Sequence, residues 1–258
     1  GQPITGTGGQ FCNLSEVVVR ATDDIKSLSK KVKLATIVGT VQSSLTKFPY
    51  LRKVWQNNTE EERLLGVSLT GIMDNPLLTS KNKGLSQTLN HLRHVAVQTN
   101  KEWAERLGVQ QSTAITCVKP SGTVSQLVDS ASGIHARHSQ HYIRTVRGDN
   151  KDPITQFMAD QGIPAEPCVM KPDTTMVFSF PIQSPKNAVT RNDMTAIEQL
   201  EMWLIYQRHW CEHKPSVTIT VKDDEWMEVG AFVYKNFDEM SGVSFLPHSD
   251  HMKKKIIL

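Results

Sequence analysis

The stretch that decides the fold class runs from Ala114 to Gln126 and reads Ala-Ile-Thr-Cys-Val-Lys-Pro-Ser-Gly-Thr-Val-Ser-Gln. Its first five residues are apolar or β-branched, which predicts a buried strand over 114–118. Pro120 ends this strand, and a turn rich in hydroxyl groups follows at 121–125. If a helix begins directly after the turn, several backbone N–H groups point the same way. The stretch therefore predicts a strand, a turn and a helix in immediate succession.

Such a turn can hold a phosphate group. Hydroxyl groups, free amides and the positive end of a helix dipole surround one anion, and Gly122 lets the backbone approach it closely. The turn is not a P-loop, because Gly-x-x-x-x-Gly-Lys-Ser/Thr is absent. An ordinary turn with Ser and Thr caps fits the same residues. The residues assigned to a phosphate are Ser121, Gly122, Thr123, Val124 and Ser125.

Short apolar strands alternate with amphipathic helices along the rest of the chain. Strands are expected at 12–19, 64–73, 114–118, 174–182, 216–221 and 242–246, and helices at about 25–45, 84–107, 152–162, 195–211 and 223–237. A polar linker is expected at 57–59. This alternation is typical of an α/β domain with a largely parallel sheet. It does not distinguish a barrel from an open sheet.

The composition is that of a globular protein, with 38% hydrophobic and 21% charged residues in 258. We expect no membrane partner and a cytoplasmic location, since neither a membrane span nor a signal peptide is visible. The net charge of +3 equals the contribution of the three lysines at 253–255, so no nucleic-acid partner is expected. The four cysteines lack paired spacing, which argues against a disulfide scaffold or a Cys-based zinc finger. The histidines at 135, 138, 141, 209 and 213 lack the company of a closed metal site, and no metal is assigned.

Four further stretches accompany the turn at 120–125. They are Phe11–Val17 (FCNLSEV), Leu65–Ile72 (LGVSLTGI), Pro215–Thr220 (PSVTIT) and Gly242–His248 (GVSFLPH), while Ser132–His135 and Tyr142–Arg147 follow the turn itself. In this order the stretches resemble the catalytic barrel of ribonucleotide reductases, and especially the adenosylcobalamin-dependent (class II) enzymes that reduce triphosphates. The resemblance implies that 1–258 is one truncated domain, the C-terminal half of a ten-stranded α/β barrel.

The resemblance also implies a chemistry. Members of the family use adenosylcobalamin to form a thiyl radical, which activates a ribonucleoside tri- or diphosphate for reduction to the deoxynucleotide. Cys12 matches one of the two thiols that reduce the ribose, and a thioredoxin-type dithiol then restores the pair. In members of the family, the partner thiol lies in a segment of the protein that precedes the position of residue 1. None of Cys117, Cys168 and Cys211 matches it.

Other family features have no counterpart in the sequence. The radical cysteine and a glutamate belong to an Asn-Pro-Cys-x-Glu loop, whereas residues 1–11 contain neither cysteine nor carboxylate. We therefore expect the chain alone to be inactive, marginally folded and suited to a complementary N-terminal reductase fragment. Two alternatives stay open: a fragment of a class I-type large subunit, or a non-catalytic remnant that binds nucleotide phosphates. A hydrolase of the α/β type is not supported, because no nucleophile elbow is present.

Overall fold

The structure, a computed structural model, describes residues 9–248. The chain divides into two compact units, of which the first comprises Gly1–Arg137 with Asn187–Leu258 and the second comprises His138–Lys186. The expectation of one domain over 1–258 stays a prediction. In the part of the chain that the structure describes, no helix has the length and apolar character needed to cross a bilayer.

Parallel strands form the centre of the first unit. β1 (Asn13–Val18), β2 (Leu65–Thr70) and β3 (Thr116–Cys117) form one parallel sheet in that order, and β7 (Val217–Val221) pairs in parallel with β8 (Val243–Pro247). A parallel bridge between Val118 and Pro215 joins the two sheets. The result is a row of five parallel strands in chain order. This confirms the parallel α/β expectation for the first unit.

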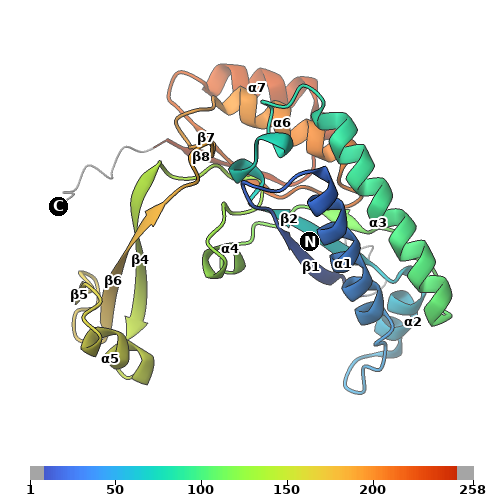
Figure 1. Cartoon of the computed structure of the whole chain (residues 1–258), viewed down its shortest axis with the longest axis horizontal. Coiled ribbons are helices and arrows are strands. Elements are labelled where there is room, and N and C mark those ends of the chain that lie inside the picture. The colour runs from blue at the N-terminus through green and yellow to red at the C-terminus, as the bar shows by residue number, and fades with distance from the viewer. Residues whose placement is uncertain (1–8, 249–258) are drawn as a thin grey trace. The chain divides into compact units, whose positions relative to one another are not determined.

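Helices and short turns connect these strands (Figure 1). They are α1 (Ile25–Ser43), α2 (Lys53–Glu62), α3 (Leu85–Leu107), α4 (Val124–Leu127), α6 (Ala196–His209) and α7 (Trp226–Lys235), with short 3₁₀ turns η1 (Ile72–Asp74), η2 (Pro76–Leu78) and η3 (Phe237–Glu239). Local sequence sets their limits. Asp24 and Thr195 each begin a helix with a capping box, and Gly108 ends α3 in a left-handed conformation. The predicted linker at 57–59 was wrong, because these residues lie inside α2.

Successive side chains along each strand point to opposite faces of the sheet. One face packs on α1, where a Cβ on Gly39 would come within 3.1 Å of Leu65 and 3.7 Å of Ser15. The opposite, helix-free face carries the alternate residues, which apart from Leu14 are small or polar: Glu16, Gly66, Ser68, Thr70, Cys117, Thr218 and Thr220. The buried residues of β7 on the helix side are Val217, Ile219 and Val221.

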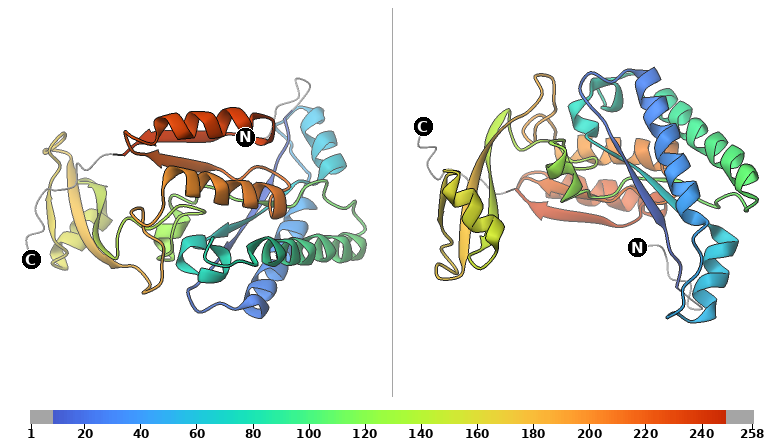
Figure 2. Two further views of the ribbon diagram at one scale, coloured as in Figure 1. Left: turned by 90° about the horizontal axis from the view of Figure 1, so that it is seen from above. Right: turned by 60° about the horizontal axis from the view of Figure 1, so that its bottom comes forward.

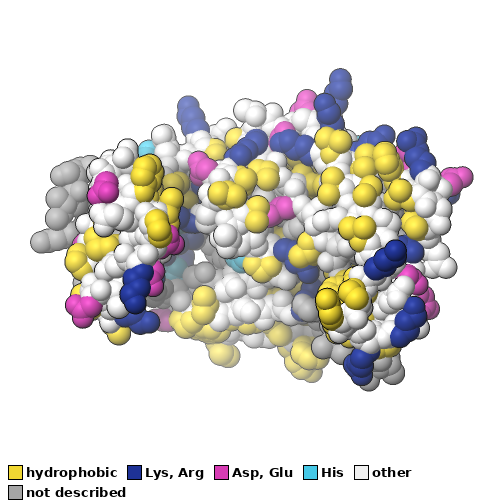
Figure 3. Space-filling model, turned by 90° about the horizontal axis from the view of Figure 1, so that it is seen from below, with side chains coloured by type: hydrophobic (Ala, Val, Ile, Leu, Met, Phe, Trp, Pro, Cys, Tyr) yellow, Lys and Arg dark blue, Asp and Glu magenta, His cyan; other side chains and the backbone are white. Residues whose placement is uncertain are grey.

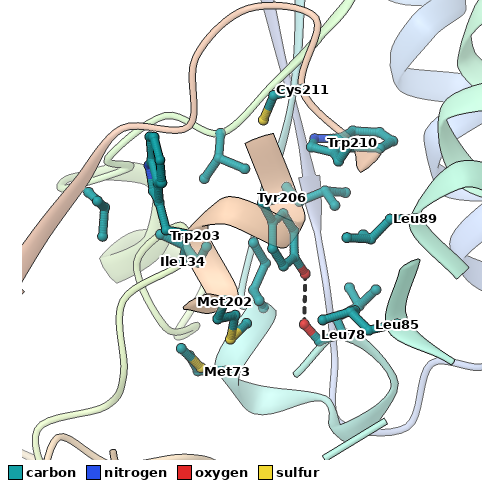
Figure 4. Close-up of a cluster of buried hydrophobic side chains, with 14 of the residues drawn as sticks. Met73, Leu78, Leu85, Leu89, Ile134, Met202, Trp203, Tyr206, Trp210 and Cys211 are labelled. Carbon is teal, nitrogen blue, oxygen red and sulfur yellow. Dashed lines mark hydrogen bonds between the residues drawn. The ribbon is translucent and has the colours of Figure 1, made fainter. Parts of the chain in front are cut away.

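The core lies between the strands and α6 (Figure 4). Three large aromatic residues of this core satisfy their polar atoms with backbone carbonyl groups. Trp203 donates to Pro215 O at 2.7 Å, Tyr206 to Leu78 O at 2.7 Å, and Trp210 to Cys117 O at 2.8 Å. Each fully buried side chain of this size contributes about 2–3 kcal/mol by leaving water. The Trp210 bond also fixes the end of β3, after which the predicted phosphate turn follows.

The second unit is antiparallel. β4 (His141–Asp149), α5 (Pro153–Asp160), β5 (Ala165–Pro167) and β6 (Thr175–Gln183) form it, with strand order β4-β6-β5. The strand expected at 174–182 exists as β6, but it does not belong to a parallel sheet. Two nine-residue strands pair in full register from His141–Gln183 to Asp149–Thr175, so this unit is a long hairpin with a short third strand. Figure 2 shows both units from two further directions.

Candidate functional site

One row of the helix-free face crosses three strands. Glu16 of β1 pairs in register with Ser68 of β2, and Ser68 pairs with Cys117 of β3. A carboxylate, a hydroxyl and a thiol therefore lie side by side on one face. Glu16 Oε1 is buried and has no hydrogen-bond partner among the described residues. A buried carboxylate oxygen of this kind suits a ligand or a neighbouring segment that donates a hydrogen bond.

The sulfur atoms of two cysteines both lie close to Gly66, next to this row. A Cβ on Gly66 would stand 3.0 Å from Cys12 Sγ and 3.5 Å from Cys117 Sγ, and it would collide with the Leu14 side chain. Glycine at this position therefore leaves room for both sulfur atoms above the middle strand. All four cysteines are free thiols.

Burial governs both thiols. It raises the pKa of the Cys12 thiol, and the charge of Lys119 opposes that rise. Burial also raises the pKa of Cys117, to about 12, again against the effect of Lys119. Because β2 lies between β1 and β3, the two backbones are about two strand spacings apart, roughly 9–10 Å. That separation is beyond the reach of a disulfide without backbone movement, so Cys117 is a poor substitute for the partner thiol that the family supplies.

The predicted phosphate turn has the expected form. It follows the C-terminal end of β3 and leads directly into α4, with Thr123 at the N-cap. Ser121 has a φ of +50°, an uncommon conformation for a residue with a Cβ. Among residues 9–248, the backbone hydrogen bonds outside helices and strands include none donated by the N–H groups of 121–123. These three consecutive amides lie next to the buried Ser121 hydroxyl, which has no partner among the described residues, and together they can donate to an anion.

The five assigned residues differ in how they can contribute. Gly122, Thr123 and Val124 are exposed, and a Cβ on Gly122 would meet nothing within 4 Å. Ser125 is buried, and its hydroxyl bonds to the Ser121 carbonyl group and lies 2.8 Å from Ser132 Oγ. Its side chain therefore stabilises the turn, so only its amide is available to a phosphate.

A second loop, at 129–133, contacts the residues that lead into the turn. Ala131 O accepts from Thr70 Oγ1 at 3.1 Å, and the Gly133 amide donates to the same hydroxyl at 2.9 Å. Gly133 has a φ of +54°, and a Cβ there would stand 2.5 Å from Lys119 O. Only glycine fits such a close approach with that backbone. The loop 129–133 thus fixes the path of the chain at Lys119 and Pro120.

A buried ion pair anchors that loop. Arg137 donates from Nε and Nη2 to the two oxygens of Asp74, both at 2.8 Å, with side-chain exposures of 3% and 4%. Asp74 also accepts the Ala131 amide at 2.9 Å. Arg137 further reaches Asp129 Oδ1 at 3.1 Å. No sequence pattern indicated this network, because Asp74 is 55 to 63 residues away from its other members and the residues carry no motif.

The histidines on these elements have structural partners. His135 Nδ1 lies 2.9 Å from Ser132 O, and its Nε2 accepts the Thr218 amide at 3.0 Å. This fixes a neutral tautomer, and burial lowers the pKa of His135. His213 Nε2 lies 2.6 Å from Leu65 O. No group of three or more His, Cys, Asp or Glu residues within 9–248 could hold a metal ion.

Cys12 and the phosphate turn lie at opposite ends of the strands. Cys12 precedes β1, whereas 120–125 follows β3, which ends at Cys117. That both line one pocket stays a prediction. The described cavity, about 550 Å³, lies beside the free edge of β1 and is lined by residues 14–18, 20, 31, 34, 35 and 38. The face drawn in Figure 3 shows basic side chains scattered among hydrophobic and acidic ones, without a continuous basic patch.

Comparison with curated proteins finds reductases. The chain is 30% identical over 200 residues to the adenosylcobalamin-dependent ribonucleoside-triphosphate reductase of Euglena gracilis, covering 75% of this chain and 27% of the relative. It is 26% identical over 274 residues to the Lactobacillus gasseri enzyme of the same name, covering 95% and 36%. The chain thus spans about a third of the length of these relatives. No protein-family model matches the chain.

Comparison with solved structures gives the same fold. A crystal structure of a B12-dependent (class II) ribonucleotide reductase matches with a TM-score of 0.79 at 23% identity, over 93% of this chain and 37% of that one. The class Id ribonucleotide reductase alpha subunit of Actinobacillus ureae matches with a TM-score of 0.61 at 13% identity, over 92% and 50%. The mixed α/β structure therefore matches part of the class II fold.

Proposed function

Because this chain is a homologue of the adenosylcobalamin-dependent (class II) ribonucleotide reductases and spans about a third of their length, we propose that it forms the C-terminal part of the catalytic barrel of such an enzyme. The five parallel strands of the first unit would be one half of the ten-stranded barrel. Their helix-free face, lined by thiols, hydroxyls and a glycine, would be its inner surface. The complete protein would reduce ribonucleoside triphosphates for DNA precursor synthesis.

Within that enzyme, the turn 121–125 would hold the substrate phosphates through its amides and through the hydroxyls of Ser121 and Thr123. Cys12 would supply one of the two reducing thiols. Loss of the 2′-hydroxyl as water and gain of hydrogen at C2′ consumes two electrons, and two thiols that become a disulfide provide them. The second thiol would come from another segment of the enzyme, and a thioredoxin-type dithiol would reduce the disulfide afterwards.

Adenosylcobalamin would supply the radical in the complete enzyme. The described residues do not form a site for it by themselves. The cavity of about 550 Å³ beside β1 has the size of a pocket for a drug-sized molecule, and a corrinoid with its nucleotide and adenosyl groups is far larger. We therefore derive no step through this cofactor from residues 9–248.

The observation that carries the proposal is the set of amides at 121–123 for which no backbone acceptor is described, at the carboxyl end of a parallel strand. Ligands of α/β proteins bind at such strand ends. The class II relatives favour this assignment over the class I-type alternative, whose structural match has the lower TM-score.

The test is binding of a ribonucleoside triphosphate to the chain by calorimetry, with inorganic triphosphate and the bare nucleoside as comparison ligands. Gly122→Ala should weaken binding at least tenfold, because the added methyl group keeps the phosphate away from the amides, while the midpoint of unfolding stays unchanged. Gly230→Ala is the matched control, since its Cβ also meets nothing within 4 Å. Thr123→Val should weaken binding by about 1.5–3 kcal/mol, the worth of a hydrogen bond to a charged group.

Two results would count against the proposal. If Gly122→Ala binds like the unmodified chain, the phosphate does not sit on these amides. Binding of phosphate without any reductase activity in the complete protein would instead favour the non-catalytic alternative.

A further inference from the structure

The backbone on both sides of Cys12 is held in place. Before it, the Phe11 ring packs against the ring of Trp55, with the two centroids 5.0 Å apart. After it, the Asn13 amide donates to Leu64 O at 2.8 Å, and the Asn13 side chain donates to the same oxygen at 3.1 Å. A cysteine side chain has one torsion with three staggered positions. The place of the Cys12 sulfur atom therefore depends on which of these positions the neighbouring residues leave open.

Gly66 leaves open the position above the middle strand. A Cβ on Gly66 would be 3.0 Å from Cys12 Sγ, well inside the separation of about 3.5–4.0 Å at which non-bonded heavy atoms attract each other best. The same Cβ would be 2.4 Å from Leu14 Cδ2. Leu14 is 53% exposed, so the end of its side chain can move aside. The sulfur atom is bonded directly to a fixed residue, so it would have to take another torsional position.

This open position brings the Cys12 thiol onto the face that carries the other polar groups. A Cβ on Gly66 would also be 3.5 Å from Cys117 Sγ, so both sulfur atoms lie over the same glycine. Cys117 pairs in register with Ser68 on the helix-free face. A thiol that hands hydrogen to a substrate on this face must point toward it, and a misplacement of about 1 Å can lower a reaction rate about a hundredfold. The proposed reduction therefore depends on the torsion of Cys12.

We propose that Gly66 is a positioning residue for the reducing thiol, because the lack of a side chain there lets Cys12 Sγ lie over the middle strand beside Cys117. This inference rests on the proposed role of Cys12. Glycine weakens the interior of a strand and often marks the close approach of another group. Here that group is the Cys12 sulfur atom. A methyl group at position 66 would turn the thiol away from the strand without removing it.

Alkylation of the chain by iodoacetamide across pH tests the place of the thiol, with each cysteine followed separately by mass spectrometry. Burial raises the pKa of the Cys12 thiol, so a thiol that has left the strand should ionise at lower pH. Gly66→Ala should therefore move the midpoint of the Cys12 profile down by about half a pH unit and raise its alkylation rate at neutral pH about threefold. Cys168 lies in the second unit and is the internal control for the reagent.

Two further variants separate the place of the thiol from general crowding of the strand. Gly39→Ala crowds the same strand from its other face, since a Cβ there would be 3.1 Å from Leu65, and it should leave the Cys12 profile unchanged. In a Leu14→Ala background the nearest clash is gone. Adding Gly66→Ala to that background should leave the free energy of unfolding unchanged and still move the Cys12 midpoint.

The complete reductase provides a kinetic readout. Gly66→Ala should lower kcat of dithiol-dependent reduction about hundredfold, the effect expected of a misplaced reacting group. KM for the ribonucleoside triphosphate should stay within about twofold, because the phosphate turn follows β3 and is not altered. A loss of folding would instead lower the amount of active enzyme and leave kcat per active site unchanged.

Each measurement can overturn the proposal. If Cys12 is alkylated alike in Gly66→Ala and the unmodified chain, Gly66 does not set the place of the thiol. If Gly39→Ala moves the midpoint as far as Gly66→Ala does, crowding of the strand is the cause and the proposal fails. If the midpoint moves only in Gly66→Ala, but Cys12→Ser leaves turnover of the complete reductase intact, the geometry stands and the reducing role of Cys12 fails.

Discussion

Replacing Arg137 by methionine should destabilise the first unit strongly. The guanidinium makes two bonds of 2.8 Å to Asp74, at side-chain exposures of 3% and 4%. Its third carboxylate contact, to Asp129, contributes little because Asp129 is 66% exposed and screened by water. Arg137→Met leaves the Asp74 charge buried, with the Ala131 amide still donating to it. Breaking a buried pair from one side costs about 3–5 kcal/mol.

The double variant Arg137→Met/Asp74→Leu separates charge from packing. Because it also removes the buried charge, it should be about 2–3 kcal/mol more stable than Arg137→Met alone. Urea unfolding followed by the fluorescence of the buried Trp203 and Trp210 measures both. Arg208→Met is the matched control: its pair with Glu239 is 2.6 Å long but nearly half exposed, so its loss should cost about 0–1 kcal/mol. A double variant no more stable than Arg137→Met would refute the reasoning.

Four further predictions follow from the same contacts. Burial lowers the pKa values of His135 and His213, so the folded protein should lose stability as the pH falls below about 6.5, the histidine pKa in an unfolded chain. His135→Gln should remove part of this loss when the free energy of unfolding is measured by urea titration at pH 7.5 and 5.5. An equal loss of stability between the two pH values in the variant and the unmodified chain would contradict this prediction. Gly133→Ala should cost more than about 1 kcal/mol and weaken triphosphate binding, because a Cβ there meets Lys119 O at 2.5 Å with φ at +54°; full stability in a melt would count against the loop's role. Cys12→Ser in a complete reductase should abolish thioredoxin-coupled turnover, and sustained turnover would remove Cys12 from the reducing pair. The chain alone should make no deoxynucleotide and should self-associate through the free edge of β1, beside exposed Leu14, Leu34 and Val38; a monomer by light scattering would refute the second half.

The sequence predicted the elements whose signals are local. The succession of strand, turn and helix over 114–127 depends on neighbouring residues, and the structure has it in the expected order, with a shorter strand at Thr116–Cys117. The helices expected at about 25–45, 84–107 and 195–211 are present as α1, α3 and α6. The segment 57–59 failed because its Asn and Thr residues suggest a turn, whereas Trp55 and the buried Thr59 hold it in a helix. Here tertiary packing outweighed propensity.

Only part of the candidate site could be predicted from the sequence. The phosphate turn is one continuous motif, so its backbone could be predicted. Glu16, Gly66, Ser68 and Cys117 come from three strands, and their proximity depends on the pairing register, which no local pattern reveals. One signal was present: counting in twos from Cys12 places Glu16 on the same face of β1. Without the pairing of β1 with β2 and β3, that count could not show which residues would face it.

The second unit is inserted between two neighbouring positions of the first unit, which makes it exchangeable. Arg137, the last residue before it, donates its amide to Val189 O at 3.0 Å and accepts the Arg191 amide at 2.8 Å. The residues that flank the 49-residue segment His138–Lys186 are therefore hydrogen-bonded to each other within the first unit. Insertions at such closed stems disturb a host fold little. Gene rearrangement could lengthen, shorten or replace this hairpin without rebuilding the strands behind it, and a protein engineer could install a reporter domain at the same seam.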